Sequence, residues 1–391
     1  MKSVSIELTT VDGWYERNAY SKIHTNITRM RIAIVLRSFP PDIIGGMETQ
    51  TKNMGTELHN ADHDVTVFTK QCGDHDDSDV PYEVARVPHW QLTPFVSDFT
   101  FLVVALLTLL RRKNEFDVLQ CMMIYPMGFL GYVVNKLAGL PYFAWIRGGD
   151  YYLMNDICWK RWMMRRVLND TLVLAQSEEI REDVTSDFSD IDCDIQVLGN
   201  AVSVPDETAY GEGVLYVGRL APKKGLEYLI KALDGLGTQL TIVGDGSERS
   251  QLEALATDTE GDITFEGEVP PDTVDRYYSS AAVFVLPSVE GEGMPNAVLE
   301  AMAWGLPVIA TNSGGLPTVI EDDLNGYLVS MRDPNSLRER IKTVIQNPKK
   351  RKQIGENARQ YVKDNHSWDS LVSEVEEIYV KLLMDKGDLE E

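Results

Sequence analysis

Short aliphatic runs alternate with helical periods over residues 31 to 198. The run RIAIVL, which starts at residue 31, is followed by a loop with Gly45 and Gly46 and then by a stretch whose apolar residues recur at helical spacing. The next run, DVTVFT, covers residues 64 to 69. A strand, a helix and a strand at this spacing form a βαβ unit, which predicts a parallel sheet covered by helices on both faces. Further strands are predicted at residues 116 to 121, 141 to 146 and 172 to 177.

A second alternating series begins after residue 212. Its aliphatic runs, which are separated by helical patterns, cover residues 214 to 218, 240 to 244, 263 to 267, 283 to 288 and 307 to 311. Residues 199 to 212 between the two series are small, polar and without periodicity, which is typical of a linker. We therefore predict an α/β protein with two Rossmann-like, doubly wound domains, residues 30–198 and 213–365. Such sheets bind ligands beyond the carboxyl ends of their strands, so the two domains would face a central cleft.

Three segments differ from this alternation. Residues 1–29 are polar and irregular, and we interpret them as an extension that is either disordered or foreign to the native protein. The apolar run FTFLVVALLTLL, at residues 99 to 110, is too short to cross a bilayer and is predicted to be a buried helix. Residues 366–391 contain a final helix whose apolar residues recur at helical spacing.

Charge and cysteine usage restrict the partners and the compartment. The 391 residues include 37 Lys and Arg against 60 Asp and Glu, for a formal net charge of -23. This field repels polyanions, so nucleic acid is not an expected partner. Cys72, Cys121, Cys158 and Cys193 form no C-x-x-C pair, which is typical of a reducing compartment. With no recognisable leader sequence, we expect a cytoplasmic protein.

Two glycine-containing turns follow strands of the second series. The turn VGRLAPKKG, at residues 217 to 225, carries Arg219, Lys223 and Lys224, and fixed cations around such a turn suit an anion with several oxygens, for example a diphosphate. A solvated basic turn is an equal alternative. The turn VGDGS, at residues 243 to 247, is a weak dinucleotide fingerprint because Arg249 replaces the last glycine. It is better interpreted as a backbone turn beneath a ligand.

The stretch VEGEGMPNAVLEAMAWG, at residues 289 to 305, predicts a helix that begins near Pro295 or Asn296 and stops at Gly305. The backbone at its start would then point into the cleft and favour an anion or a set of hydroxyls. The residues concerned are Gly293, Met294, Pro295 and Asn296.

Glu292 falls in the loop before this helix, and Glu300 about one turn inside it. Two carboxylates would repel a diphosphate, but they accept hydrogen bonds well from the vicinal hydroxyls of a sugar or a ribose. We therefore predict that the cations hold phosphate and the carboxylates hold sugar. The alternative is that both are surface or capping acids.

Two stretches of the first domain are also candidates. The glycine pair Gly45 and Gly46 would let backbone approach a phosphate or a sugar from the opposite wall of the cleft, or it is a simple flexible loop. The stretch CWKRWMMRRVL, at residues 158 to 168, interleaves tryptophan, methionine and cations. It indicates either a peripheral membrane contact or a partly buried helix with a solvated basic face.

Several of these stretches together resemble a known family. GRLAPKKG, EGMPNAVLEAMAWGLPVIATNSGGLPTVI and NGYLV resemble the C-terminal half of the retaining GT-B glycosyltransferases, called glycosyl transferases group 1 or family 4. RIAIVLRSFPPDIIGGMETQ is similar to the start of their N-terminal domain, and the resemblance covers roughly residues 30 to 385. Glu292 and Glu300 match the E-x7-E motif. The resemblance also implies that the last helix returns to the N-terminal domain.

The resemblance implies a role for each matching position. Arg219 and Lys224 would bind the donor diphosphate, Glu300 the ribose and Glu292 the transferred sugar, which makes Arg219, Lys224 and Glu292 the predicted catalytic set. The other donor contacts implied are Gly45, Gly46, Val269, Gly293, Met294, Pro295 and Asn296. Val269 would lie near the base.

The strand at 141 to 146 is followed by a departure from the family. Members often carry a histidine there, whereas this chain has IRGGD. We predict that Arg147 and Asp150 contact the sugar or the acceptor, with a packing salt bridge between them as an equal alternative. The frequent N-G-V-D stretch is replaced by NAVS at residues 200 to 203.

These observations lead to one function and two rivals. We predict a retaining, hexosyltransferase-type enzyme that moves a sugar from a UDP- or GDP-sugar to a hydroxyl of a glycan or a lipid-linked acceptor. Since no D-x-D pair lies at a strand end beside the site, we expect no metal and no further cofactor. The rivals are a GT-B nucleotide-sugar epimerase and a non-catalytic sugar-nucleotide-binding partner protein.

Overall fold

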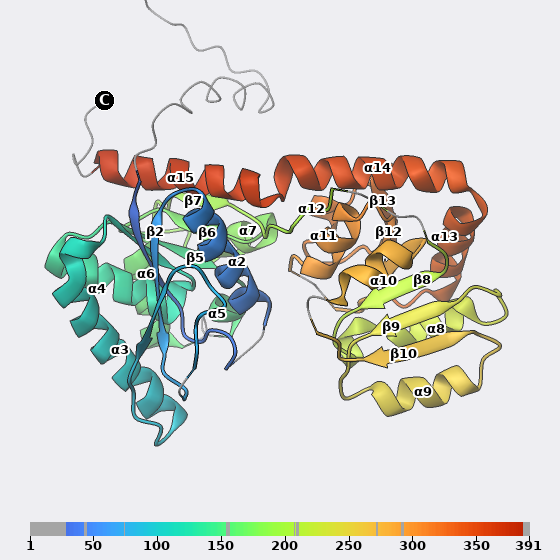
Figure 1. The fold of residues 1–391 in the computed structure, drawn as a ribbon, viewed down its shortest axis with the longest axis horizontal. Helices are drawn as coiled ribbons and strands as arrows, with labels where there is room; N and C mark the ends of the chain where they lie inside the picture. Colours follow the sequence, from blue (N-terminus) through green and yellow to red (C-terminus); the bar gives the residue numbers. More distant parts are fainter. Residues whose placement is uncertain are drawn as a thin grey trace, which may run out of the picture.

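The computed structural model describes residues 29–42, 45–73, 75–153, 157–206, 208, 211–270, 273–290 and 293–385. These residues form two parallel β-sheets, each covered by helices, which lie side by side beneath a pair of long helices (Figure 1). Apart from Arg29, the predicted N-terminal extension lies outside the described residues. The predicted linker, residues 199 to 212, separates the last strand of one sheet from the first strand of the other.

The N-terminal domain contains a sheet that has seven strands in the described residues, in the order β3-β2-β1-β4-β5-β6-β7, and neighbouring strands pair in parallel. The strands are β1 (Arg31–Val35), β2 (Asp64–Lys70), β3 (Glu83–Val87), β4 (Val118–Cys121), β5 (Tyr142–Ile146), β6 (Val173–Ala175) and β7 (Ile195–Val197). The connecting helices are α2 (Gly46–Asn60), α3 (Pro94–Arg112), η1 (Lys113–Glu115), the π-type turn η2 (Ile124–Gly128), α4 (Phe129–Ala138), α5 (Gly149–Tyr152), α6 (Cys158–Leu168) and α7 (Glu178–Asp187).

The C-terminal domain repeats this plan with six parallel strands among the described residues, in the order β10-β9-β8-β11-β12-β13. The strands are β8 (Val214–Val217), β9 (Leu240–Val243), β10 (Ile263–Gly267), β11 (Val283–Leu286), β12 (Val308–Thr311) and β13 (Gly326–Val329). The helices are η3 (Pro222–Lys224), α8 (Leu226–Leu233), α9 (Arg249–Thr257), α10 (Asp275–Ser280), α11 (Asn296–Ala303), α12 (Leu316–Val319), α13 (Pro334–Gln346), α14 (Pro348–Asn365) and α15 (Trp368–Asp385).

The strand runs are aliphatic because both faces of each sheet are covered. Residues 32 to 35 of β1 and all of β11 are buried, for example, so no alternation of polar and apolar residues is required there. In both sheets the strand order reverses between the first and fourth strands of the domain, which places the ligand crevice at the carboxyl ends of β1 and β4 and of β8 and β11. The predicted doubly wound fold class is confirmed.

The last two helices connect the domains. Helix α14 lies over the C-terminal domain and α15 continues nearly in line with it across the N-terminal domain (Figure 1). The buried residues Leu371, Val375 and Tyr379 of α15 belong to the same apolar cluster as β1 and β4. The Tyr379 hydroxyl donates to the buried Gln120 side chain of β4 at 2.6 Å. Helix α15 is therefore an integral part of the N-terminal domain.

Helix α3 corrects one sequence prediction. It is longer than the apolar run at 99 to 110, and together with η1 it is the one helix in the described chain whose length and composition would allow it to cross a membrane. The prediction of a buried helix was wrong for most of its surface. Only Phe101, Ala105 and Leu109 are buried in the domain core, whereas Phe95 and Phe99 are largely exposed.

Candidate nucleotide-sugar site

The cationic turn of the C-terminal domain lies at the carboxyl end of β8. Gly218 begins the turn, the side chain of Arg219 is exposed, and that of Lys224 is half-buried at the end of η3. The Tyr216 hydroxyl donates to the Arg219 carbonyl oxygen at 2.9 Å and holds the turn on the strand. Both predicted phosphate-binding side chains are therefore presented at the crevice edge of the sheet.

The turns after β9 and β11 pack directly against this cationic turn. A Cβ atom on Gly244 would lie 2.0 Å from the Gly218 carbonyl oxygen, and one on Gly246 would lie 2.2 Å from that of Leu220. Glycine is required at both positions by this close approach, which explains the VGDGS stretch as a backbone turn beneath the cationic one. On the other side, the Val289 amide donates to the Lys223 carbonyl oxygen at 2.8 Å.

Helix α11 begins beside this contact. It starts at Asn296, with Pro295 as the N-cap residue, and Gly305 follows its end with a positive φ of 76°, so the predicted boundaries are confirmed. Gly293 is exposed and Met294 is buried. Glu292, the predicted sugar ligand, lies outside the described residues.

Glu300 lies one turn inside α11, as predicted, and its half-buried side chain contacts α10. The buried Tyr278 of α10 donates its hydroxyl hydrogen to Oε2 of Glu300 at 2.8 Å. Burial raises the pKa of the Glu300 carboxyl, and the Tyr278 hydrogen bond opposes that shift. The carboxylate is thus held in a defined orientation, with capacity left to accept hydrogen bonds from a ligand.

Asn200, in the linker, connects the start of α11 to the N-terminal domain. Its Nδ2 donates to the Met294 carbonyl oxygen at 3.1 Å and to Oδ1 of Asn296 at 2.7 Å. Its Oδ1 accepts a hydrogen bond from Nη1 of Arg147 at 2.9 Å. The predicted donor-contact residues Met294 and Asn296 are therefore joined to Arg147 through a single buried amide.

Arg147 follows β5 at the crevice edge of the N-terminal sheet. Its guanidinium lies over the Trp145 ring, with 3.9 Å to the ring centroid, and burial lowers its pKa to about 10. It stays protonated at neutral pH. Its Nε is buried without a hydrogen-bond partner among the described residues. A buried cation with an unused donor is well suited to a polar ligand.

Asp150 is buried in α5, directly after the end of β5. Its carboxylate accepts the backbone N–H groups of Ile124 at 2.7 Å and of Arg147 at 2.9 Å, so it ties the end of β5 to η2. Burial raises its pKa to about 6, although these donors oppose the shift. In the described structure it forms no salt bridge with the Arg147 side chain, and its buried oxygens serve the backbone. Its predicted contact with sugar or acceptor remains a prediction.

Gly45 and Gly46 form the N-cap and first residue of α2. One turn further along α2, Gln50 exchanges two hydrogen bonds with Ala201 of the linker, at 2.7 and 3.2 Å. Because Ala201 follows Asn200 in the chain, the start of α2 lies close to the amide of Asn200 that joins Arg147 to α11. Val269 lies after β10 and packs, half-buried, against the C-terminal core. Its predicted contact with the base remains a prediction.

Two family models match the chain in succession. The model described as Glycosyltransferase Family 4 matches residues 44–204, and the model described as Glycosyl transferases group 1 matches residues 210–361. Together the two models cover most of the chain, and the chain is a glycosyltransferase. An uncharacterized glycosyltransferase of Methanocaldococcus jannaschii is 28% identical over 90% of this chain and 98% of its own length.

Solved structures confirm the GT-B fold of this glycosyltransferase. Sucrose-phosphate synthase from Thermosynechococcus elongatus superposes with a TM-score of 0.74 and 22% identity, covering 91% of this chain and all (100%) of that one. The Anabaena protein HepE, solved in complex with UDP, gives a TM-score of 0.71 at 18% identity, covering 90% of this chain and 100% of HepE. At these identities the likeness concerns the fold.

Sequence reasoning missed two residues of the glycosyltransferase site. Asn200 belongs to the NAVS stretch, which we noted only as a departure from a family pattern and to which we assigned no role. Tyr278 lies in α10, in a stretch without any glycine or charge pattern that would single it out. Each acts on a predicted residue through a contact between segments distant in sequence, which is why neither could be identified from spacing.

The Tyr278 contact predicts a measurable change in donor binding. In Tyr278→Phe the Glu300 carboxylate loses a donor while remaining buried, so its pKa rises further and the ionised form that accepts hydroxyls becomes less stable. We expect affinity for the nucleotide-sugar donor to fall about 10- to 150-fold, the equivalent of one hydrogen bond to a charged group. Isothermal titration calorimetry at pH 7 measures this, and the loss should grow as pH falls.

Tyr277→Phe is the matched control. The hydroxyl of this neighbouring tyrosine contacts Glu266 at 3.0 Å and Arg276 at 2.7 Å, away from Glu300. The control should bind the donor as the unmodified protein does. An equal loss in both variants would show that α10 as a whole, rather than the hydrogen bond to Glu300, determines affinity.

Proposed function

We propose that the protein is a retaining, hexosyltransferase-type glycosyltransferase that uses a UDP- or GDP-sugar and transfers the sugar to a hydroxyl of a glycan or lipid-linked acceptor. The observation that carries the proposal is a contact at the crevice edge of the C-terminal sheet, between the turn after β8 and the loop after β11. The hydrogen bond from Val289 to Lys223 places the turn bearing Arg219 and Lys224 against the loop that leads into α11. The cations proposed for phosphate follow β8, and Glu300 lies in the helix that follows β11. Because β8 and β11 are neighbours in the sheet, these groups belong to adjacent strand ends.

The proposed reaction breaks the bond between the anomeric carbon and the diphosphate oxygen, and the electron pair leaves with the diphosphate. The acceptor oxygen bonds to the anomeric carbon on the same face, and its proton passes to the departing phosphate oxygen. Arg219 and Lys224 stabilise the charge that develops on the diphosphate, at a site already organised by the turn contacts. Glu300 orients the nucleotide through its ribose, and Glu292 is assigned to the sugar.

The N-terminal domain would complete the site from the opposite side. Arg147 offers an unused, buried Nε–H and is already joined to α11 through Asn200, so it is positioned to contact the sugar or the acceptor. Gly45 and Gly46 would approach the donor from α2. The scattered, unpaired cysteines favour a cytoplasmic location.

A thermal-shift screen tests donor binding and identifies the nucleotide. UDP-, GDP- and ADP-sugars are each added to the unmodified protein and to Lys224→Ala. We expect one nucleotide series to raise the melting temperature of the unmodified protein and to have little effect on the variant, because ligand binding to the folded state alone stabilises it. A protein that responds to no nucleotide sugar would overturn the proposal.

The stereochemistry and the alternatives are tested on the product. Proton NMR of the anomeric signal shows whether the glycoside keeps the configuration of the donor, and an inverted product would contradict the retaining assignment. Conversion of the donor to an epimeric nucleotide sugar without transfer would identify an epimerase. Tight binding with neither hydrolysis nor transfer would identify a non-catalytic partner protein.

A further inference from the structure

The buried face of α2 carries one acidic residue, Glu48, which is 8% exposed. Thr51, Met54 and Leu58 follow it along this face, and the last two belong to the apolar core of the domain. Glu48 lies in the first turn of α2, at the crevice edge of the sheet, because α2 follows the carboxyl end of β1. The inward stripe of an amphipathic helix is normally apolar, so a carboxylate at its crevice end indicates a role other than packing.

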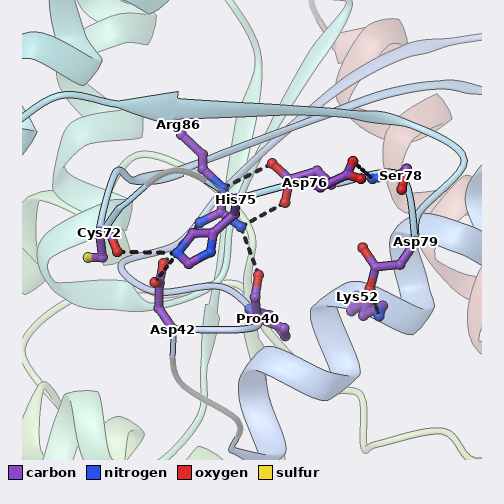
Figure 2. A network of polar contacts seen from close by, with 10 residues as sticks. Pro40, Asp42, Lys52, Cys72, His75, Asp76, Ser78, Asp79 and Arg86 are labelled. Carbon is purple, nitrogen blue, oxygen red and sulfur yellow. Dashed lines mark hydrogen bonds and ion pairs between the residues drawn. The ribbon is translucent and has the colours of Figure 1, made fainter.

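The Glu48 carboxylate has no partner of opposite charge in the part of the chain that the structure describes. It accepts the N–H group of its own residue, and burial raises its pKa. Lys52 follows at the usual spacing for a helical ion pair, but it pairs with Asp79 instead (Figure 2). Because glutamate is rarely buried in proteins unless it is paired, the remaining acceptor capacity of Glu48 points to a ligand.

The nearby carboxylate of Asp42, in the loop between β1 and α2, is fully engaged by contrast. It accepts from Arg86 at 2.9 Å and contacts His75 at 2.6 Å (Figure 2). Arg86 also donates to the Pro40 carbonyl oxygen at 2.8 Å. These contacts anchor the loop that leads into α2, so the carboxylate of Glu48 has a defined position before a substrate binds.

The start of α2 is joined to the start of α11 through the linker. Gln50, two residues after Glu48, exchanges hydrogen bonds with Ala201, and the preceding linker residue, Asn200, donates to Oδ1 of Asn296. The loop that leads into α11 is where the sugar of the donor is proposed to lie. Glu48 is therefore placed on the N-terminal wall of the crevice, beside the segment that holds the sugar from the other wall.

The position of the carboxylate selects the part of the donor that it meets. A Cβ atom on Gly45 would lie 2.5 Å from Oε2 of Glu48, so the carboxylate lies over the Gly45 backbone. A donor that approaches Gly45 and Gly46, as proposed, meets Glu48 there. A diphosphate would be repelled by this carboxylate, whereas a sugar hydroxyl donates a hydrogen bond to it. The sugar is therefore the part of the donor that fits.

We propose that Glu48 is a substrate-binding residue whose carboxylate accepts a hydrogen bond from a hydroxyl group of the transferred sugar. This inference rests on the proposed function, because it adds a contact from the N-terminal domain to the donor of that transferase. The contact discriminates between sugars, since one that lacks the hydroxyl leaves a buried carboxylate unpaired. Glu48 is thus a determinant of donor specificity.

Glu48→Gln tests the proposal in the full chain by isothermal titration calorimetry. Glutamine suits the first turn of a helix as glutamate does, and its amide oxygen still accepts, but the charge assistance is lost. We expect affinity for the nucleotide sugar found by the thermal-shift screen to fall about 3- to 15-fold. Affinity for the corresponding nucleoside diphosphate, which lacks the transferred sugar, should change less than about twofold. Unchanged nucleotide-sugar affinity, or an equal loss with both ligands, would overturn the proposal.

Glu57→Gln is the matched control. Glu57 lies near the other end of α2, is partly exposed, and accepts from Asn60 at 3.2 Å. The same change of charge on the same helix should leave both affinities unaltered, because this carboxylate is remote from the crevice. If Glu57→Gln weakens nucleotide-sugar binding as much as Glu48→Gln does, the effect belongs to the charge of the helix, and the proposed contact is wrong.

Monodeoxy analogues of the nucleotide sugar test the hydroxyl itself. For the analogue that lacks the bound hydroxyl, the loss of affinity caused by Glu48→Gln should be smaller than with the complete sugar, because the contact is already absent. The other analogues should show the full loss. A loss of the same size with every analogue would contradict the proposal, since Glu48 would then act on something other than a sugar hydroxyl.

Donor binding by the unmodified protein separates failure of this inference from failure of the proposed function. If the unmodified protein binds a nucleotide sugar and Glu48→Gln binds it equally well, the Glu48 inference fails and the transferase proposal stands. If the unmodified protein binds no nucleotide sugar, the transferase proposal itself fails, and the Glu48 inference fails with it.

Discussion

Replacing Lys224 by alanine is expected to lower kcat for sugar transfer about 100- to 1,000-fold, the usual effect of removing one preorganised group that stabilises developing charge. Lys224 ends η3, a short helix held between the β9 and β11 turns, so its position is set before the donor binds. The charge on the departing diphosphate grows as the glycosidic bond breaks, so kcat falls, and because Lys224 also binds the diphosphate of the intact donor, KM should rise as well. Steady-state kinetics of sugar transfer, with the donor that the thermal-shift screen identifies, measures the fall in kcat.

Lys223 provides the control for this prediction. It precedes Lys224 directly and its side chain is exposed, while its carbonyl oxygen accepts from Val289, a contact that does not depend on the side chain. Lys223→Ala should therefore change kcat by less than about twofold, as expected of a screened surface charge. If both variants lose activity equally, the turn provides only a general positive field, and the specific role of Lys224 is wrong.

The elements that the sequence predicted best are those that combine an aliphatic run with a clear stop signal. Strand β11 is wholly buried and is followed by the glycine-rich loop, and α11 begins after Pro295 and ends before Gly305. The strands that were missed, β3, β7 and β13, have three to five residues. In β3, EVARV, which lies at the edge of the sheet, Glu83 and Arg86 interrupt the apolar residues, so no continuous apolar run marks it.

Helix α3 shows why composition alone gave the wrong environment. An apolar run predicts that a helix avoids water, but it cannot say whether protein, lipid or a ligand covers each face. Three residues of α3 are buried in the domain, whereas Phe95, Phe99, Val103 and Leu107 are exposed. The deviation from the expected burial is thus itself informative about a partner.

Residues of the candidate site were predictable to the extent that their chemistry lies in local motifs. Arg219, Lys224 and Glu300 were each marked by neighbouring glycines and by the spacing within a strand-turn-helix unit. Asn200 and Tyr278 were not, because their function is to orient residues 96 and 22 positions away. Contacts of that separation depend on how the domains and helices pack, and a single sequence does not reveal them.

Gly225→Ala is expected to have the largest effect on the architecture of the site. Gly225 has a φ of 62°, and a Cβ atom there would lie 2.4 Å from the Pro287 carbonyl oxygen and 2.8 Å from Cγ1 of Val289. The left-handed backbone costs an alanine about 1 kcal/mol, and overlap with the fixed backbone adds about 1–3 kcal/mol. The free energy of unfolding should therefore fall by about 3 kcal/mol, as measured by urea denaturation.

Gly237→Ala separates these two contributions. Gly237 has nearly the same φ, 66°, but a Cβ atom there would meet nothing within 4 Å. Gly237→Ala should therefore lower the free energy of unfolding only by the cost of the left-handed backbone, about 1 kcal/mol, and leave donor binding intact. Gly225→Ala should additionally abolish the thermal shift given by the nucleotide sugar, because relieving the overlap moves the Lys224 turn away from the loop before α11. Equal destabilisation of the two variants, with donor binding kept in both, would mean that the two turns separate freely. The phosphate-binding cations and the sugar-binding carboxylate would then not depend on the Gly225 contact for their placement.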